Sequence, residues 1–328
     1  MKICVYGAGA VGGHIAGRLA GSPAEVSLVA RGANLAAIRE NGLRVETRDG
    51  NLVSHPVATD RPEELGSQDV VVVTVKAPAL PTIAADVGSL LGDDGVALFV
   101  TNGIPWWYFH AHGGPLDGTT LDRLDPGGGL STHVGSERAV GAVAYTACTV
   151  IAPGVVRAGN PRNRLLVGRP DGKPDDRLDA FAALLNPSGL EVTVTPDIRD
   201  AVWAKLMMNM VGGSLGVLSA SPMKDVLDKP AVAGVAEAMA AEGAAVARAL
   251  GCDPGDPAEG LSRLATSGHL QSIAQDLLAG RPMEIDALFR VPLDLAHMLE
   301  IPTPTLELVI ELATQRARAA GVYRDTDA

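Results

Sequence analysis

The N-terminal part of the chain alternates short apolar runs with stretches of helical periodicity. Small and apolar residues recur at helical spacing from Gly12 to Leu19, directly after the first run. The strands that these runs predict are 2–6, 25–30, 69–75, 95–101, 139–150, 154–158, 164–167 and 191–194. Alternation of this kind predicts an α/β fold, a doubly wound and mostly parallel sheet with helices on both faces.

Two segments interrupt this alternation. Leu43–Thr47 and Leu52–Pro56 flank Arg48-Asp49-Gly50-Asn51, which is typical of a hairpin turn, and we expect the hairpin to be added to the same sheet. Residues 106–133 are rich in Gly, Pro and His and show no periodicity. This long connection is either an ordered active-site loop or a partly mobile one.

The pattern changes after Asp197. From there to Gly321 the periodicity is helical, with stops at proline- and glycine-containing segments. We therefore predict two domains, a sheet domain at 1–197 and an all-helical domain at 198–328. The apolar helix face within 306–313 either supports a homodimer or is buried within the monomer.

A glycine motif follows the first strand. Gly7, Ala8, Gly9, Ala10, Val11 and Gly12 match G-x-G-x-x-G between a strand and a helix, which is the context that a dinucleotide-binding Rossmann unit requires. The first glycine permits the tight turn, the second lets a pyrophosphate approach the backbone, and the third lets helix and strand pack closely. The helix N-terminus offers free N–H groups to the anion.

The second strand ends in Arg31, where NAD enzymes place a carboxylate for the ribose 2′-hydroxyl. A guanidinium suits a 2′-phosphate instead, so we predict NADP(H) rather than NAD(H) as cofactor. The alternative is an ordinary solvated charge at a strand end.

Composition narrows the class of partner. The formal net charge is −11 and aromatic residues make up 3%, which argues against nucleic acid and against anionic membrane surfaces. Three widely separated cysteines and an N-terminus without a signal-peptide pattern suggest a cytoplasmic protein with free thiols. His110 and His112 have no companion ligands at metal spacing, so we expect no metal site.

Lys205 and Asn209 are four residues apart in a helical stretch and so share one face. A positioned ammonium can stabilise the negative charge that develops on a ketone oxygen during hydride transfer, and can donate the proton. The alternative is an exposed lysine beside a capping or solvated asparagine.

The chain resembles the ketopantoate reductase (2-dehydropantoate 2-reductase) family nearly end to end. The resemblance is carried, in order, by MKICVYGAGAVGG, VTVKA, TNG, RDAVWAKLMMN and SIAQDLLAGRPMEID. It implies that Arg31 is the 2′-phosphate ligand and that Lys76 and Asn102, at strand ends, line the cofactor.

The same resemblance implies roles in the helical domain. Lys205 is similar to the family's general acid, and Asn209 and Ser272 to groups that bind the substrate. Glu284 is similar to the acid that contacts the cofactor and organises the site. Glu284 is expected in the first turn of a helix, where a purely structural capping role is the alternative. Apart from the resemblance, Asp276, four residues after Ser272, is interpreted as a charge that only balances Arg281.

The sequence also departs from the family. Gly213 and Met223 stand where two further substrate-binding asparagines are expected. The aromatic segment Gly103–Phe109 is either an apolar wall over the substrate or a packed anchor for the long loop.

The resulting hypothesis is NADPH-dependent reduction of a small 2-oxo acid, 2-dehydropantoate first, to a 2-hydroxy acid, with Lys205 as proton donor. Alternatives are a reductase for a different 2-oxo or branched keto acid and a non-catalytic NADP(H)-binding sensor. Opine-forming and β-hydroxyacid dehydrogenases share the two-domain architecture, so the architecture alone does not choose among them.

Overall fold

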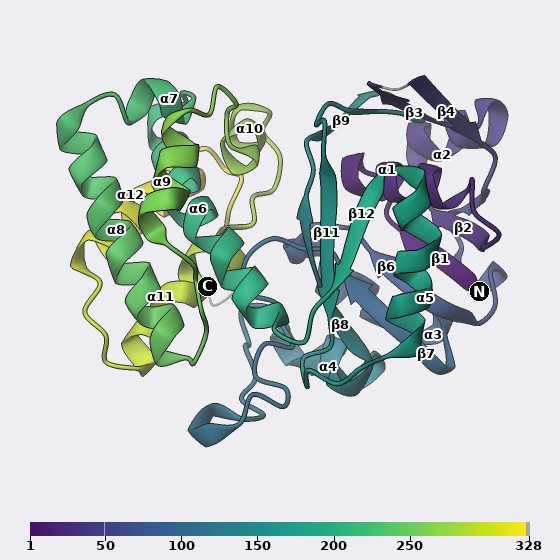
Figure 1. The fold of residues 1–328 in the computed structure, drawn as a ribbon, viewed down its shortest axis with the longest axis horizontal. Coiled ribbons are helices and arrows are strands. Elements are labelled where there is room, and N and C mark those ends of the chain that lie inside the picture. Colours follow the sequence, from purple (N-terminus) through teal and green to yellow (C-terminus); the bar gives the residue numbers. More distant parts are fainter. Residues whose placement is uncertain (49, 326–328) are drawn as a thin grey trace. The chain divides into compact units, whose positions relative to one another are not determined.

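Strands and helices alternate in the N-terminal part of the computed structural model, which describes residues 1–48 and 50–325 (Figure 1). The α/β class and the helical C-terminal part are therefore confirmed. The strands are β1 (Lys2–Tyr6), β2 (Glu25–Val29), β3 (Leu43–Thr47), β4 (Gly50–Ser54), β5 (Val57–Thr59), β6 (Gln68–Val73), β7 (Leu91–Phe99), β8 (Ala139–Tyr145), β9 (Cys148–Ala152), β10 (Val155–Ala158), β11 (Asn163–Gly168) and β12 (Leu190–Val194). The helices among them are α1 (Ala10–Leu19), α2 (Gly32–Asn41), α3 (Leu80–Leu90), α4 (Gly129–His133) and α5 (Asp176–Leu185).

The larger sheet has the strand order β12-β11-β8-β7-β6-β1-β2-β5. Its pairs are parallel except for β8 with β11, so the predicted mostly parallel sheet is confirmed. Most buried side chains of the central strands β1 and β6 are apolar, and Ile3, Val5, Val70 and Val72 have no exposed surface. A sheet covered on both faces requires such continuous apolar runs.

The sheet reverses its winding direction between β1 and β6. The chain moves from β1 through α1 to β2 on one side and from β6 through α3 to β7 on the other. Because parallel crossovers are right-handed, α1 and α3 must cover opposite faces. The loops after β1 and β6 therefore diverge and leave a crevice at the carboxyl edge of the sheet, where ligands bind in folds of this kind.

A second, smaller sheet corrects three sequence expectations. Its order is β4-β3-β10-β9, so the predicted hairpin forms but is not added to the main sheet. Residues 139–150, expected as one strand, form β8 in the larger sheet and β9 in the smaller, and the strand predicted at 154–158 is β10 of the smaller sheet. Asp49, in the predicted turn, lies outside the described residues.

Helix α1 lies between the two sheets, which explains why Gly12–Leu19 is buried all round. A Cβ at Gly13 would lie 2.7 Å from Val156, and one at Gly17 would lie 2.4 Å from Val45. Small residues on this side of α1 therefore let the smaller sheet approach the helix closely.

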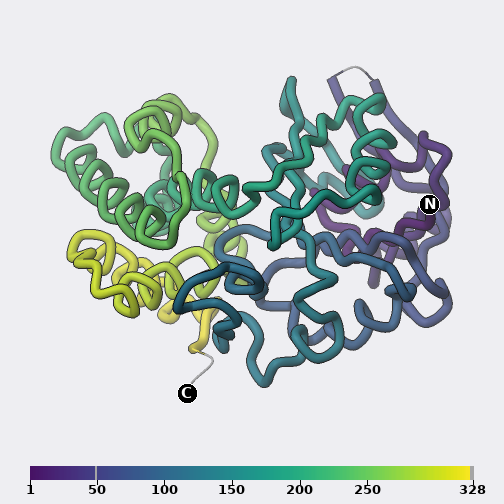
Figure 2. The backbone as a smooth tube through the Cα atoms, turned by 60° about the horizontal axis from the view of Figure 1, so that its bottom comes forward, coloured from purple at the N-terminus to yellow at the C-terminus, as the bar shows by residue number. Residues whose placement is uncertain are grey.

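The chain divides into two compact units. The first contains 1–101, 106–120 and 127–198, and the second contains 102–105, 121–126 and 199–328. Two pieces of the long connection after β7 thus pack with the C-terminal helices. Figure 2 follows the chain through this connection. As independent folding domains, 1–197 and 198–328 remain a prediction.

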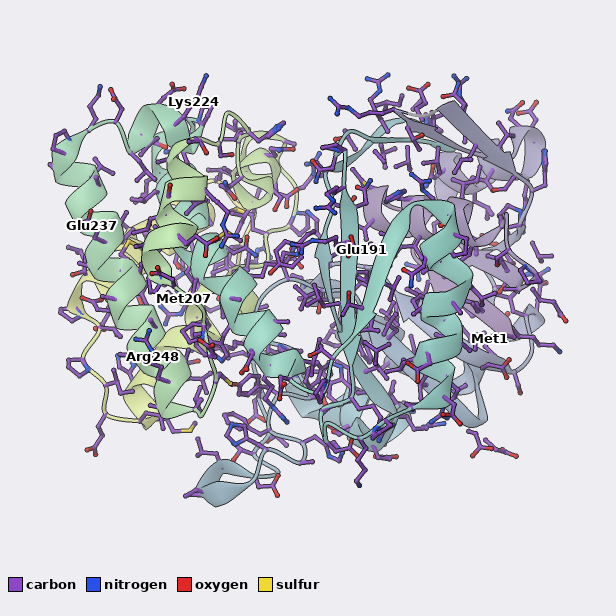
Figure 3. The ribbon with its side chains drawn as sticks, in the orientation of Figure 1. Met1, Glu191, Met207, Lys224, Glu237 and Arg248 are labelled. Atoms are coloured by element: carbon purple, nitrogen blue, oxygen red, sulfur yellow. The ribbon has the colours of Figure 1, made fainter. Side chains whose placement is uncertain are left out.

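The second unit is built from helices. They are α6 (Ile198–Ser219), α7 (Met223–Val226), α8 (Pro230–Ala249), α9 (Pro257–Ala265), α10 (Ser272–Leu278), a π-helix (Asp286–Arg290), α11 (Val291–Met298) and α12 (Pro304–Ala319). Figure 3 shows Met207 of α6 among the helices, whereas Lys224 and Glu237 lie at the periphery.

The apolar faces of α12 and α6 bear on two questions, whether the chain forms a dimer and whether it spans a membrane. On α12, Leu306, Val309, Ile310 and Ala313 are buried within the unit, which favours the monomer-core interpretation of that face. Among the described residues, α6 is the helix long and apolar enough to cross a membrane, yet 67% of its apolar window is buried. Core helices of soluble proteins pass the same test, so this is weak evidence for a membrane span.

Candidate functional site

The glycine turn after β1 has a steric reason for its first and third glycines. Gly7 has φ +112°, and a Cβ at Gly12 would lie 1.9 Å from the Gly7 carbonyl oxygen. The Thr74 hydroxyl donates to the same oxygen at 2.8 Å, which ties the turn to the end of β6. A Cβ at Gly9 would meet nothing within 4 Å, so the space above the second glycine is open for a ligand.

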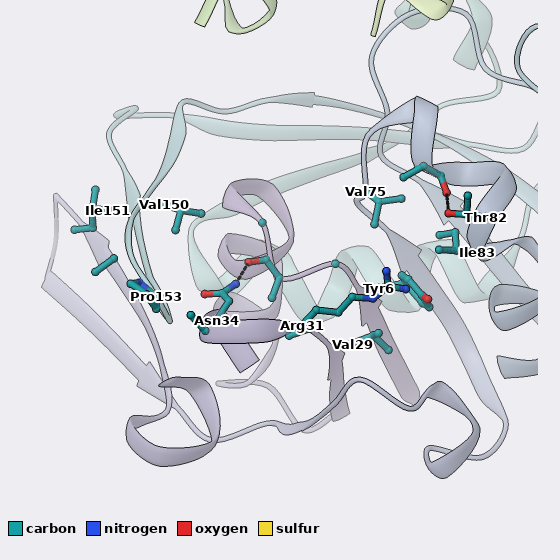
Figure 4. A pocket seen from close by; sticks show the side chains of 17 residues that line it. Tyr6, Val29, Arg31, Asn34, Val75, Thr82, Ile83, Val150, Ile151 and Pro153 are labelled. Carbon is teal, nitrogen blue, oxygen red and sulfur yellow. Dashed lines mark hydrogen bonds between the residues drawn. The ribbon is translucent and has the colours of Figure 1, made fainter. Parts of the chain in front are cut away.

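A cavity of about 640 Å³ opens beside this turn (Figure 4). It is lined by Gly7, Ala8, Gly9 and Arg31 of the predicted site and, in addition, by Tyr6, Val29, Ala30, Ala33, Asn34, Val75, Ala79, Thr82, Ile83, Val150, Ile151, Ala152 and Pro153. The glycine turn after β1 and Val75 after β6 place it at the crevice where the sheet reverses direction. Its size and its mostly apolar lining suit the adenosine half of a dinucleotide.

Arg31 lies at the exposed mouth of this cavity. It directly precedes α2, and its side chain hydrogen-bonds the hydroxyl of Tyr6. That hydroxyl in turn donates to Asp86 at 2.6 Å, so Tyr6 holds the guanidinium against the end of β1. An exposed guanidinium fixed at the end of β2 has the geometry to bind a phosphate on an adenosine ribose.

Other predicted cofactor residues lie elsewhere. Ala10, Val11 and Gly12 form the first turn of α1, whose N-terminus is preceded by Gly9. Lys76 follows β6 by three residues and precedes a short 3-10 turn, Ala77–Ala79. The cavity lining does not include Lys76, which is consistent with a place further along the carboxyl edge.

Lys205 lies on α6 in the second unit, and its environment changes its acidity. Burial lowers the pKa of its ammonium from 10.5 to about 8, while the negative charge of Glu284 partly opposes this change. A lysine with a pKa near neutrality can both hold a proton and release it during a reaction.

Glu284 is 7% exposed. It lies immediately before the helical turns, whereas the sequence predicts it inside the first turn. Its main-chain carbonyl still accepts the N–H of Leu288 at 3.1 Å, as expected at a helix N-terminus. Its carboxylate accepts a hydrogen bond from the Asn102 amide at 3.3 Å. The second unit thus brings Asn102, Glu284 and Lys205 together.

Residues 102–105 pack closely on the π-helix. The Ile104 N–H donates to the Ala287 carbonyl at 2.8 Å. Gly103 has φ +84°, and a Cβ there would lie 2.2 Å from the same carbonyl oxygen. A π-helix often marks a functional site, and here the Ala287 carbonyl fixes the segment that carries Asn102.

Asn209 is partly exposed one turn after Lys205, and Ser272 is the exposed first residue of α10. The chain before and after Ser272 packs against glycines of α6. A Cβ at Gly212 would lie 3.4 Å from the Gln271 side chain, and one at Gly213 would lie 3.2 Å from Ile273. These glycines cost helix propensity but let the N-terminus of α10 approach the helix that carries Lys205.

Gly213 and Met223, the two positions at which the sequence departs from the family, lie in the packed core. Gly213 faces Ile273 and Phe289, and Met223 has no exposed surface. A polar side chain at either position would be buried, so neither departure opens a new pocket. In the same part of the chain, Arg281 pairs with Asp276 at 2.9 Å, as expected from their spacing.

The aromatic segment is also buried. Trp106, Trp107, Tyr108 and Phe109 are each at most 4% exposed, and Trp106 packs edge-to-face on Phe99 with ring centroids 5.5 Å apart. This supports the anchor interpretation over an apolar wall. Within 1–48 and 50–325, no three His, Cys, Asp or Glu side chains are placed to hold a metal ion.

Sequence reasoning missed Asn34 and Tyr6. Asn34 lies in the first turns of α2, where its amide donates to the Ala8 carbonyl and its oxygen accepts the Gly154 N–H at 2.6 Å. No motif marks either residue, because their partners are distant in the sequence. The only local signal was their proximity to the glycine motif and to Arg31.

Comparison with known proteins gives consistent matches. Residues 3–107 match the family model described as ketopantoate reductase PanE/ApbA, and residues 197–317 match its C-terminal domain. The chain is 38% identical to 2-dehydropantoate 2-reductase of Mesorhizobium japonicum, over 98% of this chain and 100% of that protein. It is 30% identical to the enzyme of the same name from Halobacterium salinarum, over 95% and 97%. A crystal structure of a PanE/ApbA family ketopantoate reductase from Ralstonia eutropha superposes with a TM-score of 0.83 at 27% identity, covering 98% and 100%.

Proposed function

The chain belongs to the ketopantoate reductase (PanE/ApbA) family of nicotinamide-dependent oxidoreductases, and we propose that it reduces 2-dehydropantoate to pantoate with NADPH, a step toward pantothenate and coenzyme A. The observation that carries this proposal is the partly buried Lys205, whose pKa is lowered to about 8 beside the carboxylate of Glu284. A sensor would need the glycine turn but not this acid.

The residues of the first unit fit the cofactor. The open space above Gly9, the N-terminus of α1 and the exposed Arg31 match the pyrophosphate and 2′-phosphate of NADP(H). Lys76 would extend the site along the carboxyl edge, as its place after β6 allows. The reduced nicotinamide, when bound, supplies the hydride to the keto carbon.

The residues of the second unit fit the remaining chemistry. Lys205 donates the proton to the keto oxygen as negative charge develops there, so that the 2-oxo acid becomes a 2-hydroxy acid. Asn209 and Ser272 bind the polar end of the substrate. Glu284 keeps Lys205 protonated near neutral pH, and Asn102 fixes the carboxylate through its hydrogen bond.

The test is oxidation of NADPH in the presence of 2-dehydropantoate and a panel of other 2-oxo acids. We expect Lys205→Ala to lower kcat by roughly 10²–10⁴-fold, the usual contribution of a general acid, while NADPH still binds. Lys224→Ala, an exposed lysine on α7, serves as the matched control. Unchanged turnover in Lys205→Ala would contradict the assigned role.

A second candidate is reduction of a different 2-oxo or branched keto acid. Its support is the departure in sequence, because Gly213 and Met223 stand where the family's further substrate-binding asparagines are expected. Turnover of another 2-oxo acid without turnover of 2-dehydropantoate would favour it. NADPH binding without turnover of any acid in the panel would instead favour a sensor.

We further propose a cytoplasmic protein whose partner is this small molecule. The net charge of −11 disfavours nucleic acid and anionic membrane surfaces. For a homodimer, the available apolar surface on α12 is the exposed pair Leu308 and Leu312.

A further inference from the structure

The outer side of the cofactor cavity is formed by a segment that does not belong to the nucleotide-binding sheet. Residues 150–153, at the end of β9 and the turn into β10, line the cavity although both strands are in the smaller sheet. Val150 and Ile151 there are 42% and 39% exposed, unusual values for large apolar side chains. Figure 4 shows them across the cavity from Tyr6 and Val75.

We infer that this turn is the outer wall of the adenosine subsite and that Asn34 is the positioning residue that holds it there. The inference rests on the proposed use of NADPH. In this arrangement the adenine ring, which is flat and largely apolar, packs against the exposed side chains of Val150 and Ile151.

The Asn34 side chain connects two backbone segments that no secondary structure joins. Its amide donates to the carbonyl of Ala8 in the glycine turn, and its oxygen accepts the N–H of Gly154 in the β9–β10 turn at 2.6 Å. Both functional ends of one side chain are therefore used on backbone groups, one at Ala8, which lines the cavity, and one directly after Pro153, which also lines it. Asn34 itself is carried by α2, which Leu35 and Ile38 anchor in the core.

The turn is fixed from its other side as well. The Gly154 carbonyl accepts the N–H of Arg44 at 2.9 Å, and β10 pairs in parallel with β3. Gly154 has φ +73°, a conformation that favours glycine. Backbone pairing thus holds the base of the hairpin, while Asn34 sets the distance between its tip and the glycine turn.

The consequence is that cofactor binding and catalysis depend on different residues. Binding of the adenosine half should depend on Asn34 and on the apolar wall, whereas the keto acid and the proton donor lie in the other unit. Loss of Asn34 should therefore raise KM for NADPH and leave kcat and KM for the keto acid unchanged.

The experiment measures binding without turnover. Kd values for NADPH, by nucleotide fluorescence, and for 2′,5′-ADP, by calorimetry, are compared between the wild type, Asn34→Ala and Ile151→Ser. Asn41→Ala is the matched control, because Asn41 is an exposed residue of the same helix. Steady-state kinetics and Tm are recorded for each variant.

We expect Asn34→Ala to raise both Kd values by the same factor of about tenfold, which corresponds to about 1.4 kcal/mol and is within the net worth of two hydrogen bonds. Ile151→Ser, which removes part of the apolar wall at a half-exposed position, should raise them by a few-fold. Unchanged Kd for 2′,5′-ADP in both variants overturns the inference. So does an Asn34→Ala variant in which kcat and both KM values change together with Tm, because that result indicates general disruption.

A failure of the proposed function is separate from these outcomes. If no 2-oxo acid is reduced but the wild type binds NADPH and 2′,5′-ADP, the comparison of Kd values stands unaffected. Absence of binding to both nucleotides in the wild type would overturn the cofactor proposal and this inference together.

Discussion

Replacing Glu284 with Gln should make the proton donor more acidic. Burial already lowers the pKa of Lys205 to about 8, and the charge of Glu284 is what opposes that effect. A nearby opposite charge shifts a pKa by about 1–3 units, so loss of this one should lower the Lys205 pKa by at least about one further unit. One unit corresponds to about 1.4 kcal/mol.

The sign of the effect on rate follows from the protonated form being the active one. At pH 8 about half of the wild-type lysines carry a proton, against about one in ten after a one-unit fall. Between pH 6, where both proteins are largely protonated, and pH 8, kcat should therefore fall about twofold in the wild type and about tenfold in Glu284→Gln. The alkaline limb of the pH profile should move to lower pH.

The assay is kcat at saturating NADPH and keto acid from pH 6 to pH 9. Saturation separates this effect from weaker binding, which Glu284 could also cause through Asn102. Glu237→Gln, an exposed acid on α8, is the control. A limb that stays in place or moves to higher pH would refute the electrostatic role of Glu284.

Further predictions concern the first unit. Arg31→Ala should raise KM for NADPH by about 10–100-fold and leave KM for NADH nearly unchanged, because a charge-assisted hydrogen bond contributes about 1.5–3 kcal/mol; equal changes in the two KM values would contradict its role. Gly12→Ala should lower the free energy of unfolding in urea by about 3 kcal/mol, since its Cβ would lie 1.9 Å from a carbonyl oxygen. Gly9→Ala should leave the free energy of unfolding unchanged but weaken nucleotide binding, because its Cβ would occupy the space left open for the ligand. Burial, with the charge of Arg18 adding to it, lowers the His14 pKa to about 4, below its usual value of about 6.5. The unfolded state therefore binds the extra proton, and stability should fall by up to about 1.4 kcal/mol per unit as pH drops from 6.5 to 4, a slope that His14→Gln should lack.

The parts of the fold that follow from local chemistry were predictable. The glycine motif could be predicted because the close approach of Gly12 to the Gly7 carbonyl occurs within one strand-turn-helix unit. The change to helical periodicity after Asp197 likewise depends only on neighbouring residues. The hairpin at 43–54 was recognised for the same reason.

Which sheet that hairpin joins was not predictable. Its partner β10 is more than one hundred residues further along the chain, and the apolar pattern of β3 suits either sheet. Asn34 was missed for a related reason, since its contact with Gly154 spans 120 residues. The resemblance predicts a substrate-binding position at Gly213, but Ile273 and Phe289, which pack against it, make that position part of the core.

The route of the chain after β7 has a consequence for the order of folding. Asn102 reaches its partner Glu284 across 182 residues, and Arg123 reaches Asp294 across 171. During synthesis, residues 102–105 and 121–126 leave the ribosome long before the helices on which they pack. Contacts of such sequence separation close late because loop closure costs entropy before they form. The Asn102–Glu284 pair that acts on Lys205 is therefore expected to form only when nearly the whole chain has been made, so a nascent or truncated chain would lack catalytic activity.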